Sequence, residues 1–244
     1  MYVALLANLR ASEHGVRTMS PSSLSSSATL TASEFRRLAR QRLHETPSEA
    51  IFDPSTGRSW GRSDFDLNPE LLAELALMDP PRPAAVLVPV VAREQLTVLL
   101  TVRTDHLPTH AGQIAFPGGK VDSRVDSSPL ATALREAQEE IGLEARYIEP
   151  LGFLDSYRSG TGFHIMPVVA LVEPNFTLKP DPAEVADVFE VPLSFLMDTA
   201  NHQRHSREWR GRLRYFYAIP FGDRYIWGAT AGMIRNLHER LFGA

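Results

Sequence analysis

The chain has 244 residues, a formal charge of −4, 43% hydrophobic residues and no cysteine. That length is enough for one sizeable hydrophobic core with extensions, and the slight acidity argues against a nucleic-acid partner, which requires a basic face. The absence of cysteine excludes disulfides, a thiolate nucleophile and a cysteine zinc site, and no apolar run reaches membrane-spanning length. These features are compatible with a reducing compartment, so we expect a cytoplasmic protein without nucleic-acid or membrane association, and homodimerisation stays open.

The first 80 residues differ in composition from the rest of the chain. Residues 1–32 contain the serine-rich run SPSSLSSS and are predicted to form a flexible extension. Residues 33–80 are predicted to form a helical segment, because apolar residues from Phe35 to Leu43 recur at helical spacing and a second short helix is indicated over 68–78. A cluster of prolines ends this segment, so the main domain is predicted to span residues 81–244.

The main domain alternates between strand and helix patterns. Apolar and alternating runs predict strands at 84–91, 96–103 and 114–116, a hairpin formed by 147–156 and 163–172, and late strands at 212–219 and 224–227. A helical turn is indicated over 181–187 and an amphipathic helix over 228–242. The fold class is therefore α/β (α+β), with a central helix packed on a sheet.

That central helix lies in the stretch 118–143, which begins with a glycine pair. The helix is predicted to begin near Ser127 or Ser128, because Pro129 suits a first helical turn. It is predicted to end at Gly142, since glycine adopts the left-handed terminal conformation without strain. Apolar side chains recur between these limits at helical spacing and form one stripe, made by Leu130, Leu134, Ala137 and Ile141.

Three acidic side chains lie beside that stripe. Glu136, Glu139 and Glu140 fall within an arc of roughly 100° on the helix. Glu136 and Glu140 form an i,i+4 pair of like charges, which weakens a helix by about 0.2–0.5 kcal/mol, and Arg135 alone does not balance three acids. A bound divalent cation would balance their charge, because Mg²⁺ prefers carboxylate oxygens. The alternative is a solvated acidic helix face, and the helix alone does not decide between the two.

The segment from Arg135 to Leu143, REAQEEIGL, resembles the second half of the Nudix box, REUxEExGU, where U is a bulky aliphatic residue. Ala137 is small for its position. The first half, G-x5-E-x7-R, would require glycine and glutamate where Val121 and Ser127 stand, and the nearest acid is Asp126. The loop before the helix is therefore expanded.

An upstream segment resembles the coenzyme A diphosphatase branch of this family, whose signature is LLTxR(S/A)x3Rx3Gx3FPGG. Leu99–Arg103, Gly112 and Phe116–Gly119 match in register. Thr104 stands for serine or alanine, and Pro108 stands for the second arginine, which removes a cation that could face a substrate phosphate. With further similar segments, the resemblance covers about residues 84–242.

The resemblance implies a Nudix-type α/β/α sandwich with a mixed β-sheet between helices. It implies hydrolysis of the diphosphate linkage of coenzyme A or acyl-CoA, a small-molecule nucleotide, to 3′,5′-ADP and 4′-phosphopantetheine or its acyl form, with Mg²⁺ or Mn²⁺ as cofactor. A broader nucleoside diphosphate hydrolase acting on ADP-ribose or dinucleotides is the alternative favoured by the missing arginine. A non-catalytic binding module is disfavoured, because such modules usually lose a box glutamate and none is lost here.

The same resemblance implies roles for individual residues. Metal would be held by Glu136, Glu140 and the Gly119 carbonyl, and catalytic roles would fall to Glu139 as ligand or base, to Arg135 as the orienting cation and to Glu184 near the metal or water. Substrate would contact Arg103, Gly118, Arg158 and Thr161. Ordinary structural roles compete for several of them: a helix N-terminal acid for Glu184 and a hairpin tip for Arg158 and Thr161. Trp227 is expected to be a core residue rather than a base-stacking platform.

Overall fold

A computed structural model of the chain describes residues 30–48, 61–71, 79–107, 109–209 and 211–243. Most of the predicted extension, and residues 72–78 of the second predicted helix, lie outside the described residues. No helix in the described part of the chain is long and apolar enough to cross a membrane.

The main sheet is mixed, as the family resemblance implies. Its central strands β2 (Arg82–Val91) and β8 (Phe163–Val172) are parallel, and β3 (Thr97–Arg103) runs antiparallel to β2. The path continues to β4 (Ile114–Ala115) at one end and through β7 (Tyr157–Arg158) to β1 (Arg62–Ser63) at the other. Off this path, β5 (Gly118–Lys120) pairs with β2, β6 (Ile148–Phe153) with β8, and β9 (Val185–Pro192) with β3.

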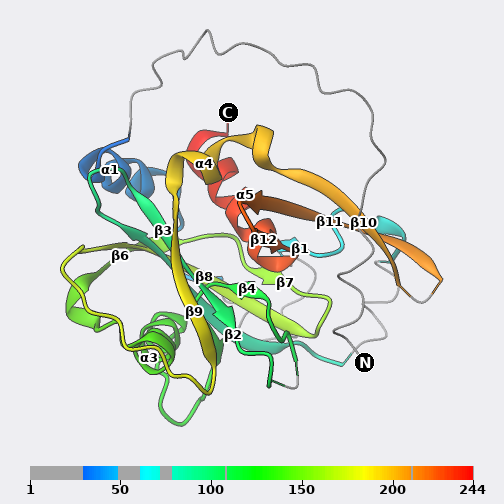
Figure 1. The fold of residues 1–244 in the computed structure, drawn as a ribbon, viewed down its shortest axis with the longest axis horizontal. Coiled ribbons are helices and arrows are strands. Elements are labelled where there is room, and N and C mark those ends of the chain that lie inside the picture. The colour runs from blue at the N-terminus through cyan, green and yellow to red at the C-terminus, as the bar shows by residue number, and fades with distance from the viewer. Residues whose placement is uncertain (1–29, 49–60, 72–78, 108, 210, 244) are drawn as a thin grey trace, which may run out of the picture.

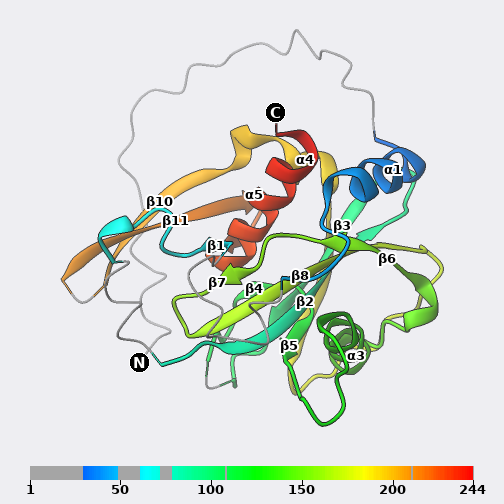
Figure 2. The same ribbon diagram turned by 180° about the vertical axis from the view of Figure 1, so that it is seen from behind.

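Helices cover both faces of this sheet (Figures 1 and 2). Helix α3 (Pro129–Ile141) packs on one face, where its apolar side chains join Leu87 and Leu99. On the other face, α1 (Ala32–Arg42), α4 (Leu193–Met197) and α5 (Ala229–Phe242) join Val88 and Leu100. Adjacent strand residues point to opposite faces, so apolar strand runs supply both cores. The predicted sandwich is confirmed.

Helix α3 has the predicted ends. The Ser128 hydroxyl accepts a hydrogen bond from the Ala131 N–H at 3.1 Å, and Pro129 occupies the first turn. Gly142 ends the helix in the left-handed conformation, with φ of 69°. These local signals place the acidic side chains on the helix as expected.

Helix α1 belongs to the same core as the strands. Thr31 caps it in a reciprocal arrangement with Glu34, and Phe35 and Ala39 are fully buried against the main sheet and α5. The described part of residues 33–80 also contains β1 and a short 3-10 turn at Pro69–Leu71, so it is not helical throughout.

Several later elements differ from the sequence predictions. Residues 182–184 form a turn, as expected in that region, but a full strand, β9, follows it. The two predicted late strands, β11 (Arg212–Phe221) and β12 (Arg224–Trp227), are present, and β10 (Gln203–Trp209) joins them to form a second sheet. The predicted hairpin is confirmed with its first strand divided into β6 and β7, both antiparallel to β8.

Candidate active site

The acidic side of α3 lies against the glycine pair of β5. The Gly118 N–H donates a hydrogen bond to Oε2 of Glu140 at 3.0 Å. The Glu136 carboxylate lies over Gly119 so closely that a Cβ at that position would overlap it. A Cβ at Gly118 would overlap the backbone of Ala85 in the neighbouring strand. Gly119 therefore leaves room for the Glu136 carboxylate of the helix, and Gly118 lets β5 approach β2 closely.

Glu140 is buried, with 4% of its surface exposed. Burial raises the pKa of its carboxyl to about 7, although the Gly118 N–H and the Arg103 guanidinium oppose that rise. Arg103 Nη1 lies 3.6 Å from Glu140 Oε1. The negative charges of Glu136 and Glu184 raise the pKa of Glu140 further, which shows that these acids share one electrostatic environment.

Glu136 and Glu139 share a single cation. Arg135 Nη1 lies 2.8 Å from a carboxylate oxygen of each. Burial raises the pKa of Glu136, Arg135 opposes that rise, and the charges of Glu139 and Glu184 add to it. Glu184 is exposed on the turn before β9, and its carbonyl accepts a hydrogen bond from the Thr104 N–H at 3.0 Å. The fold thus brings the turn at Glu184 to the end of β3.

Asp126 is a site residue to which the sequence assigned no role. Nε and Nη2 of Arg135 donate to its two carboxylate oxygens, each at 2.9 Å. The carboxylate also accepts from the Thr132 hydroxyl at 3.0 Å and the Asp122 N–H at 2.9 Å. Hydrogen bonding from Arg135 lowers the pKa of Asp126 to about 2. The only sequence signal for a role of Asp126 was its place next to Ser127, the position where the Nudix box has a glutamate.

The end of β3 aims Arg103 at the glutamates. The β3–β9 register shifts between Val102 and Arg103, a bulge that redirects the side chain. The turn that follows holds both backbone groups of Arg103, whose N–H donates to the Gln113 carbonyl at 3.0 Å and whose carbonyl accepts from the Gly112 N–H at 3.1 Å. His110, with φ of 59°, closes this turn through its Nδ1 and the Gln113 side chain at 2.9 Å.

Comparison with known proteins identifies the family of the chain. A family model described as NUDIX domain matches residues 81–210, more than half of the chain. The chain belongs to the Nudix family. Similar relatives include proteins named "Uncharacterized Nudix hydrolase NudL" from Yersinia pestis (strain Pestoides F) and Yersinia pseudotuberculosis serotype O:1b, each 41% identical over 160 residues, covering 66% of this chain and 80% of the relative.

Solved structures show a more distant likeness. The binary complex of a C. elegans Ap4A hydrolase is 18% identical, with a TM-score of 0.40 over 46% of this chain and 80% of that chain. A Nudix hydrolase from M. smegmatis, RenU, is 22% identical, with a TM-score of 0.40 over 50% of this chain and 76% of that chain.

Two residues predicted to contact substrate, Arg158 and Thr161, lie on β7 and in the turn after it, and not on the elements that carry the glutamates and Arg103. Arg158, on β7, is 2% exposed, and burial lowers its pKa. The Thr161 hydroxyl lies 3.0 Å from that of Ser159, in the turn between β7 and β8. The same turn is held by Asp64, which accepts a hydrogen bond from the Gly160 N–H at 2.7 Å. Substrate contact by Arg158 and Thr161 stays a prediction.

Nudix hydrolases generally use divalent metals such as Mg²⁺ or Mn²⁺. Among the residues that the structure describes, no three acidic or histidine side chains lie close enough together to hold a metal ion in this conformation. Arginines lie beside the carboxylates instead: Arg103 is 3.6 Å from Glu140, and Arg135 is 2.8 Å from Glu136. The helix sequence alone did not reveal the contact with Arg103. The donor chemistry nevertheless fits a hard divalent cation, because Glu136 and Glu140 present carboxylate oxygens beside the backbone of Gly118 and Gly119. Burial raises the pKa of both carboxyls although an arginine lies beside each.

Proposed function

We propose that this Nudix protein hydrolyses the diphosphate linkage of coenzyme A or acyl-CoA. Water would add across the P–O–P bond and release 3′,5′-ADP and 4′-phosphopantetheine or its acyl form. The main support is a contact between two motifs: Arg103, from the segment that resembles the coenzyme A diphosphatase signature, lies 3.6 Å from Glu140, from the segment that resembles the Nudix box. One motif thus supplies a cation for a phosphate where the other supplies the carboxylates.

The proposed roles follow from where each group lies. Glu136, Glu140 and the Gly119 carbonyl would hold Mg²⁺ or Mn²⁺, and Arg135 would orient Glu136 and Glu139. A bound divalent cation would neutralise charge on the diphosphate oxygens, which otherwise repel a nucleophile. Glu139 or Glu184, both exposed, could accept the proton of the attacking water. Gly118 and Arg103 would face the substrate phosphates.

The test is product identification with purified protein, coenzyme A and Mg²⁺ or Mn²⁺. We expect 3′,5′-ADP and 4′-phosphopantetheine by liquid chromatography and mass spectrometry, and no turnover after chelation of the metal. Glu140→Gln should lower kcat by about 10²-fold or more. Glu144→Gln is the matched control, because Glu144 lies just beyond the helix and its carboxylate pairs with the exposed Arg146 at 2.7 Å. Full turnover in Glu140→Gln would refute the proposed metal site.

The second candidate is a broader nucleoside diphosphate hydrolase acting on ADP-ribose or dinucleotides. The observation that favours it is Pro108, which stands where the coenzyme A signature has an arginine. A substrate panel that compares kcat/KM separates the two, and a preference for ADP-ribose over coenzyme A would reverse the order. Tight ligand binding without any product would instead indicate a non-catalytic binding module.

A further inference from the structure

The second sheet carries aromatic rings on one face that the proposed hydrolytic site does not use. His205 of β10 lies opposite Phe216 of β11, and Trp227 of β12 lies opposite Ala218, two residues farther along β11. Side chains two residues apart on a strand share a face, so these rings and Tyr225, opposite Pro220, lie together. We call His205, Phe216, Tyr225 and Trp227 the aromatic platform.

The four rings of the aromatic platform form a continuous row, in which each ring lies next to the following one. Ring centroids are 5.2 Å apart for Phe216 and Trp227, 6.3 Å for His205 and Phe216, and 5.8 Å for His205 and Tyr225. Hydrogen bonds fix the imidazole, since Nδ1 of His205 lies 2.6 Å from the Tyr225 hydroxyl and Nε2 lies 2.8 Å from the Gln203 side-chain oxygen. Tyr225 is 41% exposed and the other three rings are half-buried. Trp227 was expected to be a core residue, and that prediction is wrong. The platform is a held, partly exposed ring surface.

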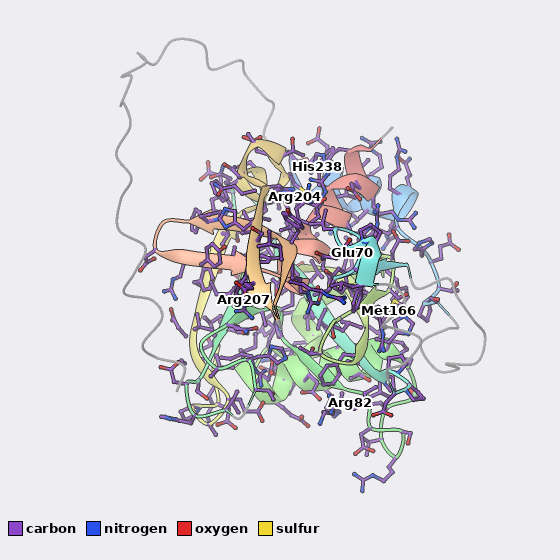
Figure 3. All side chains as sticks on the ribbon, turned by 90° about the vertical axis from the view of Figure 1, so that its right-hand side faces the viewer. Glu70, Arg82, Met166, Arg204, Arg207 and His238 are labelled. Carbon is purple, nitrogen blue, oxygen red and sulfur yellow. The ribbon has the colours of Figure 1, made fainter. Side chains whose placement is uncertain are left out.

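Positive charge gathers beside the aromatic platform. Arg207 of β10 lies directly opposite Arg214 of β11 on the same face. The Arg207 guanidinium carbon is 5.7 Å from the centroid of the Trp227 ring, and Arg214 pairs with Asp64 at 3.3 Å. Figure 3 labels Arg204 close to His238 of α5, and Arg207 farther along β10. Like charges directly opposite destabilise a sheet. Asp64 already offsets part of the charge of Arg214, and a bound phosphate would add a second anion beside Arg207.

The second sheet is fastened to the strands that position the candidate active site. Directly after β12, the Thr230 hydroxyl donates to the Ile114 carbonyl at 3.0 Å. Ile114 pairs with Val102, the residue before Arg103. Arg224, at the start of β12, pairs with Asp187 of β9 at 2.6 Å, three residues beyond Glu184. The platform is thus tied on two sides to the segments that carry Arg103 and Glu184.

We infer that the aromatic platform binds the planar base of a nucleotide, with Arg207 and Arg214 facing a phosphate of the same ligand. Proteins often bind a nucleotide base of any identity by stacking it on aromatic side chains with an arginine nearby. The inference deepens the proposed function and rests on it for the identity of the nucleotide, 3′,5′-ADP or the corresponding part of coenzyme A. The base subsite then lies on β10–β12, apart from the glutamates of α3.

The experiment measures binding of 3′,5′-ADP and of inorganic pyrophosphate to the full chain by calorimetry, with Mg²⁺ present. Phe216→Leu should weaken 3′,5′-ADP binding by about tenfold and leave pyrophosphate, which has no base, unchanged. The matched control is Tyr215→Leu: Tyr215 is the preceding residue on the opposite face, with the Arg204 guanidinium carbon 4.0 Å from its ring centroid, and both affinities should be retained. Because Phe216→Leu could disturb folding, the exposed Arg207→Gln provides a second test, and it should weaken 3′,5′-ADP more than adenosine.

Each outcome separates this inference from the proposed function. If coenzyme A is not hydrolysed but 3′,5′-ADP binding depends on Phe216 and not on Tyr215, the subsite stands and the substrate assignment fails. If coenzyme A is hydrolysed with the same KM in the wild type and in a folded Phe216→Leu protein, the subsite is refuted and the proposed function stands. Equal losses in the Phe216 and Tyr215 variants, or no 3′,5′-ADP binding by the wild type, would also refute the subsite.

Discussion

Asp126 and Arg135 form the ion pair on which the orientation of the acidic helix face depends. Arg135 reaches Asp126 with two nitrogens and reaches Glu136 and Glu139 with the third. The planar guanidinium makes these bonds in a fixed fork, so the Asp126 end sets the direction of the other end. Asp126 is therefore a positioning residue for the two glutamates.

Asp126→Asn should destabilise the fold by about 1–3 kcal/mol, because the amide cannot accept both guanidinium bonds and leaves Arg135 partly unpaired. Urea unfolding measures this loss. Asp122→Asn is the control: that carboxylate is more exposed, pairs with the exposed Arg124, and should contribute little. Equal losses in the two variants would show that the Asp126–Arg135 pair contributes no more to the free energy of unfolding than an exposed ion pair does.

At the scale of elements, Asp155 joins three segments that are distant in sequence. It lies between β6 and β7, and its carboxylate accepts from Asn236 at 2.8 Å and from Arg240 Nε at 3.1 Å, both on α5. His44 Nε2, just beyond α1, lies 3.0 Å from the same carboxylate. Burial alone would raise the pKa of Asp155, but hydrogen bonds from Arg240, His44 and Asn236 outweigh burial and lower it. The cluster therefore holds α1 and α5 to the sheet while Asp155 is ionised.

The sign of the pH dependence follows from that lowered pKa. Stabilisation by Asp155 is fully present above its ordinary pKa of about 3.9 and is lost as the pH falls through the lowered value, because the unfolded chain binds the proton first. Asp155→Asn should be less stable than the wild type by about 1–3 kcal/mol at neutral pH, and the difference should shrink as the pH falls below about 4. Thermal unfolding across this range measures it. Asp223→Asn, with 95% of that side chain exposed, should show no such dependence. A difference between Asp155→Asn and the wild type that is constant with pH would contradict the assignment.

The elements that the sequence predicts correctly are those with strong local signals. Strands β2, β3 and β8 are apolar runs, and α3 has a cap, a proline and a terminal glycine. Strand β10 has the sequence QRHSREW, whose polar residues give no hydrophobic alternation, so only its pairing with β11 reveals it. In β9, Glu190 interrupts the run of apolar residues. Its Oε1 pairs at 2.7 Å with Nη2 of Arg93, which lies in the turn after β2. Pairing, rather than local preference, decides such strands.

At the scale of the whole molecule, both faces of one sheet are buried, and the N-terminal segment covers part of one face. Phe35 has no exposed surface and belongs to the same core as Val88, Leu100 and Leu237. The predicted domain boundary at residue 81, where the Nudix match also begins, therefore runs through a shared core. The residues before it contribute to stability.

Phe35→Ala should lower the free energy of unfolding by about 3–5 kcal/mol, because it leaves a cavity between α1 and the sheet. Urea unfolding followed by tryptophan fluorescence measures the shift of the main transition. Phe242→Ala, at a side chain that is 47% exposed, should shift it much less. An unchanged main transition in Phe35→Ala would mean that residues 33–80 fold separately from the rest.

The sequence by itself determined the acidic helix, its limits and the side of it on which Glu136, Glu139 and Glu140 lie. Those features depend on residues within a few positions of one another, so periodicity and capping suffice. Only the tertiary structure decided that Arg103 meets Glu140, that Gly119 makes room for the Glu136 carboxylate, and that four aromatic rings gather on β10–β12. These contacts join residues far apart in the chain, and they exist because the strands pair in the register that buries apolar side chains on both faces of the main sheet.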